Sequence, residues 1–441
     1  MIPDSNELTI KKILLFWLPL ESTWLMMAME SSLISAFIAR MAEPKFNLAA
    51  YGVAFSFILV IEAPILMIIS ASTALVQDRD SFLKMRYFTF ILIGGVTLIM
   101  GVVLLPVVFH FLARQVIHLP ERVADLTYQA ILISLPVPWA IGIRRFYQGI
   151  LIRHNRTRLV ALGTALRLTT LILLGLALYH FSGLNGASVG ASVMTAAVLL
   201  ESVFSQTMTR PFVKELIQEP QIQGSNKKQS LSYGEIFHFY LPLALTSLLG
   251  LGVQPTVTFF VSKSRMALES LAVLPVIIGL VFIFMSCGLS FHEASIALLG
   301  EKNRNYKQLG KFALGLSGIT VGLFICIGFT PLSHLWFRSV SGLSLELTQF
   351  ALTPVKILAL MPGLWMLLTF QRSVLVNSRH TGPITWATGL ELVLVISSLY
   401  IGIHYMEALG AIAAVVALVI GRVGGNLCLF PSFLKILKRR V

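Results

Sequence analysis

Twelve ionisable side chains lie inside long apolar stretches of the sequence, where charge is costly. A charged residue at the centre of a membrane helix costs about 2.5–3.5 kcal/mol on insertion scales, so each needs a partner, water or a role. Six are acidic and six are basic: Glu21, Glu30, Glu62, Glu201, Glu293 and Glu391, with Arg144, Arg145, Arg167, Lys356, Arg372 and Arg422. Because the numbers balance, the count alone does not predict whether the site binds an anion or a cation.

Glu62 and Glu30 are the strongest acidic candidates. Glu62 stands near the middle of an apolar stretch, two residues before Pro64. A proline there bends the helix and frees a backbone carbonyl, a common way to build an ion or substrate site. An ion pair between Glu62 and Arg167 is the structural alternative. Glu21, nine residues before Glu30, falls on the opposite helix face at about 100° per residue, and Glu30 is the deeper of the two.

The basic candidates are Arg144, Arg145, Lys356 and Arg372. A guanidinium matches the geometry of carboxylate and phosphate. The alternative is that these long side chains reach the lipid headgroups. Three further candidates complete the set: Arg167 and Glu391, both in mid-span, and Gln254, which with Pro255 marks a second helix break that we expect to line a cavity.

The composition predicts an integral membrane protein. Only 12% of the 441 residues are charged and 56% are hydrophobic, whereas a soluble domain has about 25% charged residues.

The acidic start of the chain does not resemble a signal peptide, and the three cysteines form no CxxC pair. There is no complete HExxH motif and no Walker A motif. We therefore expect no enzyme, no cofactor and no metal site, and a coupling H⁺ or Na⁺ remains open.

We predict an all-α polytopic membrane protein whose transmembrane helices form two six-helix bundles. The sequence contains twelve apolar stretches of suitable length: 13–40, 47–76, 83–112, 123–152, 158–180, 185–210, 234–262, 270–299, 310–337, 346–376, 383–404 and 408–434. The predicted domains are an N-terminal lobe at 1–218, a cytoplasmic linker at 219–232 and a C-terminal lobe at 233–441.

With both termini in the cytoplasm, inner segments hold 21 Lys and Arg and outer loops hold 7. The net charge of +14 then reflects topology and attraction to anionic lipid, and no nucleic-acid partner is needed.

The two halves repeat. The segments FWLPL at 16–20 and FYLPL at 239–243 are 223 residues apart, and Gly186-Ala187 and Gly410-Ala411 are 224 apart. Pro136 and Trp139 have counterparts in Pro362 and Trp365 at an offset of 226. A parallel repeat of six spans is typical of transporters. The glycines at 94, 95 and 101 have the spacing of close helix packing.

This pattern resembles the MATE-like (MOP) exporter superfamily, and within it the ANK (progressive ankylosis) family. The ANK-like segments are LAAYGVAFS at 48–56, GILIRH at 149–154 and LPLAL at 241–245, with Pro255 and FVS at 260–262. The long acidic C-terminal tail of that family is absent. The resemblance implies an exporter working by alternating access of two lobes, and we expect the protein to be a monomer. An ANK-like protein would move organic or phosphate-rich anions such as citrate, pyrophosphate or nucleotide. The alternatives are a MATE-type cation or multidrug antiporter driven by H⁺ or Na⁺, and a flippase for a lipid-linked precursor. We place the protein in the cytoplasmic membrane if its source is bacterial.

Overall fold

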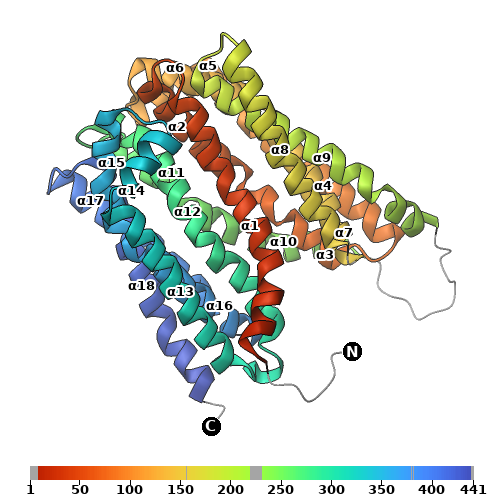
Figure 1. The fold of residues 1–441 in the computed structure, drawn as a ribbon. Coiled ribbons are helices and arrows are strands. Elements are labelled where there is room, and N and C mark those ends of the chain that lie inside the picture. Colours follow the sequence, from red (N-terminus) through yellow and green to blue (C-terminus); the bar gives the residue numbers. More distant parts are fainter. Residues whose placement is uncertain (1–7, 155, 219–230, 379, 381, 439–441) are drawn as a thin grey trace, which may run out of the picture. The chain divides into compact units, whose positions relative to one another are not determined.

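The computed structural model describes residues 8–154, 156–218, 231–378, 380 and 382–438 (Figure 1). Across these residues, eleven helices are long and apolar enough to cross a membrane. A twelfth span follows if α6 and α7, which meet at a 42° bend, cross together. The prediction of an all-α polytopic protein is therefore confirmed.

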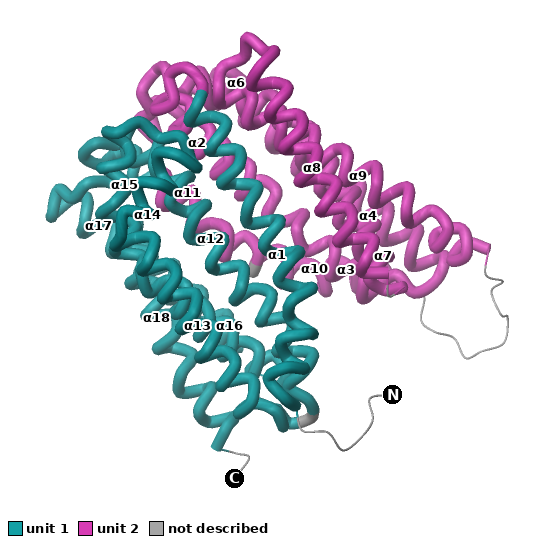
Figure 2. The backbone as a smooth tube through the Cα atoms, viewed as in Figure 1, with its two compact units in different colours: residues 1–40, 259–441 teal, residues 41–258 magenta. Residues whose placement is uncertain are grey.

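The helices form two compact units, which Figure 2 shows in different colours. Unit 2 comprises residues 41–258, and unit 1 comprises residues 1–40 with 259–441. The elements of unit 2 are α2 (Pro44–Glu62), η1 (Ala63–Met67), α3 (Ile68–Leu75), α4 (Arg79–Val103), α5 (Pro106–His110), η2 (Phe111–Val116), α6 (Glu121–Ile133), α7 (Val137–Arg153), α8 (Thr157–Phe181), α9 (Gly186–Gln218), α10 (Tyr233–Leu251) and most of α11 (Val253–Val261). The elements of unit 1 are α1 (Ile10–Ala39), α12 (Ala267–Leu298), η3 (Glu301–Asn303), α13 (Tyr306–Phe329), α14 (Leu332–His334), η4 (Leu335–Val340), α15 (Leu345–Ile357), η5 (Leu358–Leu360), α16 (Met361–Asn377), α17 (Gly382–His404) and α18 (Gly410–Lys438).

The first helix of each repeat packs in the unit that holds the rest of the other repeat. Helix α1 packs along α12, and α10 packs against η1 and α3. The units therefore differ from the predicted lobes at 1–218 and 233–441 by the exchange of these two helices. Trp17 and Glu21 explain the attachment of α1, because both bond to serines of α12. Most of the predicted linker, residues 219–230, lies outside the described residues.

The repeat extends to unusual backbone features. The π-helices η2 and η4 are 224 residues apart, as are α6 and α15, and α7 and α16. At the start of α9, the Ala187 N–H donates to Asn47 Oδ1 at 2.9 Å, and at the start of α18 the Ala411 N–H donates to Ser270 Oγ at 2.9 Å. The offset of 226 predicted for the fourth and tenth spans is two residues too long, because the helix bounds of α7 and α16 differ by 224.

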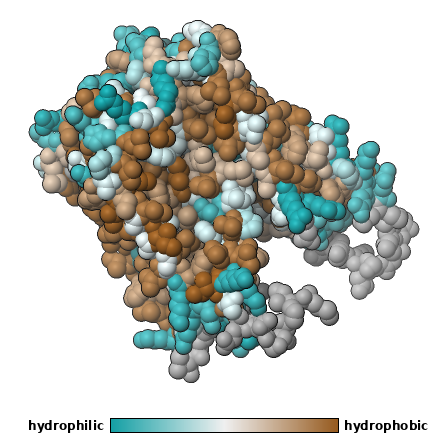
Figure 3. Space-filling model, viewed as in Figure 1, coloured by the Kyte–Doolittle hydropathy of each residue, from teal (hydrophilic) through white to brown (hydrophobic). Residues whose placement is uncertain are grey.

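The surface agrees with a membrane setting. In Figure 3, brown hydrophobic side chains run along the helices of unit 1 and hydrophilic ones gather at the helix ends. Large apolar side chains such as Leu98 and Leu314 are 68% and 77% exposed. Such exposure is unfavourable in water but suits contact with lipid.

Candidate functional site

The first candidate site surrounds the predicted break at Glu62 in unit 2. Helix α2 ends at Glu62, the 3₁₀ turn η1 carries Pro64, and α3 resumes at Ile68. The Tyr240 hydroxyl of α10 donates to the Pro64 carbonyl, so the break is held by a side chain of the exchanged helix. Glu62 is only 3% exposed. The proline therefore breaks the helix where the sequence predicts, and a buried carboxylate lies at the break.

Glu201 of α9 is the centre of the ion pairs in this region. Its carboxylate pairs with Arg144 of α7 and, at 3.1 Å, with Arg167 Nη1 of α8. Gln148 Nε2, one turn along α7, donates to the other oxygen at 3.1 Å. All four side chains are at least nine-tenths buried. Arg167 is thus bound to Glu201, whereas the sequence analysis considered Glu62 as its partner.

The cluster has an excess of positive charge. We call Glu62, Arg144, Arg145, Gln148, Arg167 and Glu201 the unit 2 charge cluster. Arg144 and Arg145 both lie close enough to Glu62 to act on it electrostatically. Glu62 Oε2 and Arg145 Nε are buried with no hydrogen-bond partner in the described part of the chain. With three guanidinium groups and two carboxylates, the ionised cluster carries a formal charge of +1.

A second buried cluster lies in unit 1, between α16, α17 and α18. Arg422 of α18 forms two contacts with Glu391 of α17: Nη2 to Oε1 at 3.0 Å and Nη1 to Oε2 at 3.3 Å. The Arg422 guanidinium also lies 4.0 Å from the centre of the Trp365 ring. Arg372 Nη2 donates to Thr388 Oγ1 at 3.1 Å. We call Trp365, Arg372, Glu391 and Arg422 the unit 1 arginine cluster.

Four predicted residues, Glu30, Lys356, Gln254 and Pro255, are not members of the two clusters defined above. Glu30 is half-buried on α1. Lys356 is exposed, with its ammonium 5.8 Å from the centre of the Phe329 ring. Gln254 and Pro255 are half-buried in the first turn of α11, after the helix break at Gly252. The break near Pro255 is as predicted, whereas its lining of a cavity stays a prediction.

Glu21 and Arg422, which the sequence analysis does not place among the candidate site residues, both make buried polar contacts. Glu21 is 7% exposed and accepts hydrogen bonds from Ser286 and Ser290 of α12 at 2.8 and 2.5 Å. Trp17 Nε1 donates to the same Ser290 at 2.7 Å. Serines one helical turn apart on α12 were the available signal, because they can serve a buried acid on a neighbouring helix. For Arg422, the signal was the buried acid Glu391 on the preceding helix.

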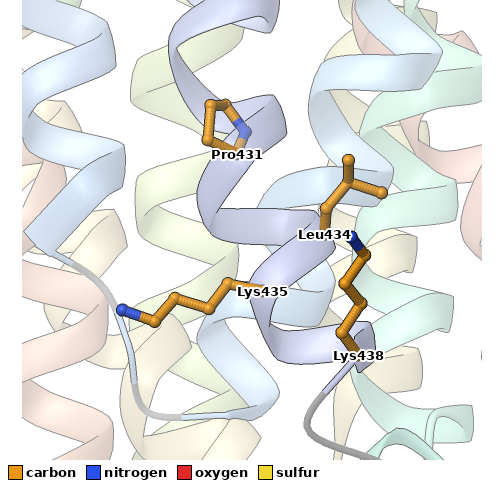
Figure 4. A pocket seen from close by; sticks show the side chains of 4 residues that line it. All are labelled: Pro431, Leu434, Lys435 and Lys438. Atoms are coloured by element: carbon orange, nitrogen blue, oxygen red, sulfur yellow. The ribbon is translucent and has the colours of Figure 1, made fainter.

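A pocket at the end of α18 lies apart from the unit 1 arginine cluster. Pro431, Leu434, Lys435 and Lys438 line it, and Figure 4 shows the two lysine side chains extending from the last turns of the helix. Pro431 comes nine positions after Arg422, which is about 14 Å along a helix. Within the described ranges, no group of three His, Cys, Asp or Glu side chains could hold a metal ion.

Comparison with known proteins gives similarity in structure only. No family model matches the chain, and no curated protein matches it. An inward-facing multidrug resistance MATE family transporter of the MOP superfamily is similar with a TM-score of 0.74 at 15% identity, covering 96% of this chain and 97% of that one. A MOP superfamily transporter from Pyrococcus furiosus, whose binding pocket is described as having reverse polarity, has a TM-score of 0.68 at 14% identity, with coverage of 98% and 96%. The lipid II flippase MurJ, in an inward closed conformation, has a TM-score of 0.69 at 14% identity, with coverage of 96% and 90%.

The chain therefore has the fold of MATE and MOP superfamily transporters over nearly its whole length. The predicted resemblance to that superfamily is confirmed at the level of fold. At 14–15% identity the similarity does not assign a substrate. Closeness to the ANK family stays a prediction.

Proposed function

We propose that this protein is a secondary transporter that exports a small organic or phosphate-rich anion of the citrate, pyrophosphate or nucleotide type by alternating access. The excess of arginine in the buried clusters is the observation that carries the substrate class. Arg145 has a buried Nε without a partner among the described residues, and Glu201 already serves Arg144 and Arg167. A guanidinium in a membrane interior binds a carboxylate or phosphate more readily than a cation.

Glu62 is assigned the coupling role, through H⁺ or Na⁺. Its carboxylate lies at a helix break and within electrostatic range of Arg144 and Arg145. An anionic substrate near those arginines would compete with Glu62 for them, so substrate and coupling ion would be linked through the same charges. Glu30 is assigned a gating role on α1, and Lys356 and Arg372 would add positive charge.

The test is uptake into proteoliposomes of labelled citrate, pyrophosphate and ATP, with an imposed H⁺ or Na⁺ gradient. We expect Arg145→Gln to abolish uptake, Arg145→Lys to retain part of it, and Glu62→Gln to remove its dependence on the gradient. Arg114→Gln is the matched control, because Arg114 is exposed and its pair with Glu121 is on the surface. All variants are first compared with the unaltered protein by thermal unfolding.

Other results would replace this proposal. Gradient-driven transport of organic cations that requires Glu62 and is unchanged by Arg145→Gln would indicate a MATE-type antiporter. Movement of lipid-linked phosphates, with no transport of soluble anions, would indicate a flippase. The likeness to both kinds of protein makes these two the relevant alternatives.

A further inference from the structure

The unit 1 arginine cluster places two guanidinium groups around one carboxylate. Arg422 binds both oxygens of Glu391, and Arg372 acts electrostatically on Arg422 and Glu391 while donating a hydrogen bond to Thr388. Residue Arg422 is 9% exposed and residue Glu391 is 8% exposed. The ionised cluster therefore holds one uncompensated positive charge inside unit 1.

The unsatisfied atoms of these four side chains are all donors, although two neighbouring residues, Gln371 and Asn426, also have a buried side-chain oxygen without a partner among the described residues. Trp365 Nε1, Arg372 Nε and Arg422 Nε are buried without a hydrogen-bond partner in the ranges that the structure describes. A buried donor that makes no hydrogen bond is energetically costly, because it has lost its water without gaining another partner. Three N–H groups of this kind require acceptors. A ligand with several acceptor oxygens and negative charge would satisfy both the donors and the excess charge, whereas a cation would satisfy neither.

Glycines bring the backbone of α18 against Glu391. A Cβ at Gly421 would lie 2.6 Å from Val395 Cγ2, and one at Gly425 would lie 3.3 Å from Glu391 Oε2. On α12, a Cβ at Gly288 would lie 2.6 Å from Trp365 Cδ1. Glycine has no side chain at these positions, where a Cβ would displace Glu391 or the Trp365 indole. The arrangement is therefore fixed by packing on two sides.

The unit 2 charge cluster differs in this respect. There the central carboxylate, Glu201, receives donors from Arg144, Arg167 and Gln148, and the buried atoms without a hydrogen-bond partner among the described residues include an acceptor, Glu62 Oε2, as well as the Nε atoms of Arg144 and Arg145. In unit 1, Glu391 is bound by one arginine, and the unpartnered atoms Trp365 Nε1, Arg372 Nε and Arg422 Nε are donors.

We propose that Arg372, Arg422 and Trp365 form an anion site within unit 1, for a phosphate or carboxylate group, and that Glu391 is an internal competitor for it. This inference rests on the proposed function and names the residues that hold the anion in unit 1. When the anion binds, it takes over the Arg422 contacts that Glu391 otherwise occupies. Removing the negative charge of Glu391 therefore strengthens anion binding, and removing Arg372 weakens it.

The experiment is titration of the purified full-length protein with pyrophosphate and with citrate, by calorimetry and by tryptophan fluorescence, at ionic strength matched with sodium chloride. We expect Arg372→Gln to weaken binding about tenfold to a hundredfold, the loss of one charge-assisted hydrogen bond. Glu391→Gln should tighten it about tenfold or more. Trp365→Phe should remove the fluorescence change while the calorimetric signal persists.

Arg338→Gln, a change of the same kind at an exposed arginine of unit 1, should leave binding unchanged. Arg372→Lys covers the case in which the glutamine variant does not fold, and it should bind with intermediate affinity. Nanodiscs of phosphatidylglycerol and of phosphatidylcholine separate the two sources of phosphate. Competition by phosphatidylglycerol that Arg372→Gln relieves would identify a lipid headgroup as the anion, and its absence would identify a soluble one.

Two results would overturn the site. One is anion binding that is equal in the unaltered protein, Arg372→Gln and Glu391→Gln but lost in Arg145→Gln, which would leave the proposed function standing. The other is weaker binding in Glu391→Gln than in the unaltered protein, since Glu391 would then help to hold the ligand. Failure of the unaltered protein to bind or transport any of the anions would instead remove the proposed function.

Discussion

At the scale of single residues, the buried charges are organised by shared partners. Among the described residues, Glu201 forms ion pairs with two arginines, whereas Glu391 forms an ion pair with one. Glu21 accepts hydrogen bonds from hydroxyl groups of α12. In each unit a buried Glu–Arg pair joins two consecutive helices, but the order of the two helices that carry the acid and the base differs between the units. The acid is on α9 and the base on α8 in unit 2, while the acid is on α17 and the base on α18 in unit 1.

Glu201→Gln should strongly destabilise the protein. The substitution leaves Arg144 and Arg167 buried without their counter-ion, and breaking a buried ion pair costs about 3–5 kcal/mol. Asp80→Asn is the control, because its pair with Lys84 is partly exposed and such a pair contributes at most about 1 kcal/mol. Unfolding in detergent, followed by helical circular dichroism, measures both. Equal stability of the two variants would mean that Glu201 has no structural role in the cluster.

Candidate residues could be selected from the sequence, but not their partners. A charge in an apolar stretch is visible in the sequence, so Glu62, Arg144 and Arg167 were identified. Which of them meet depends on how α2, α7, α8 and α9 pack, and hydropathy carries no information on that. Glu201 was therefore left out of the predicted site, although it binds two of the selected arginines.

At the scale of the elements, glycine allows α3 and α7 to approach closely. A Cβ at Gly149 would lie 1.8 Å from Ser72 Oγ and 2.7 Å from the Ile69 backbone oxygen. The serine could rotate, but the backbone could move only with the helix. The predicted close packing at Gly94, Gly95 and Gly101 is wrong within the described structure, because nothing lies within 4 Å of a Cβ at any of the three.

Gly149→Val should therefore separate α3 from α7 and destabilise unit 2 by about 1–3 kcal/mol, the usual cost of overpacking. Gly94→Ala is the matched control and should be neutral or stabilising by up to about 1 kcal/mol, since alanine favours the helix. The midpoint of thermal unfolding reports the difference. A Gly149→Val protein as stable as Gly94→Ala would contradict the close contact between the two helices.

At the scale of the whole molecule, the spans were predictable and their grouping was not. Long apolar stretches identify membrane helices one by one, so all twelve predicted stretches correspond to described helices or bent pairs. Sequence order suggested that helices 1–6 and 7–12 pack together. The exchange of α1 and α10 depends on contacts such as Trp17 with Ser290 and Tyr240 with Pro64, which join residues 273 and 176 positions apart.

The charge distribution predicts that both termini are cytoplasmic. Lys438 and Arg338 are exposed residues of unit 1 that the prediction places on opposite sides of the membrane. In a background in which the three native cysteines are replaced by serine, a membrane-impermeant maleimide should label Arg338→Cys in intact cells and Lys438→Cys only in inverted vesicles. The reverse pattern would place the termini outside.

The exchange of α1 also sets an order for biogenesis. The residues of unit 2 form one continuous stretch, 41–258, which is synthesised before any of α12. Helix α1 is synthesised before α12, so it lies in the bilayer without its packing partner until residues 267–298 leave the ribosome. At typical translation rates this delay is on the order of ten seconds or more. During that time Glu21 lacks Ser286 and Ser290, so a carboxyl group enters the membrane well before the hydroxyls that will bind it are made.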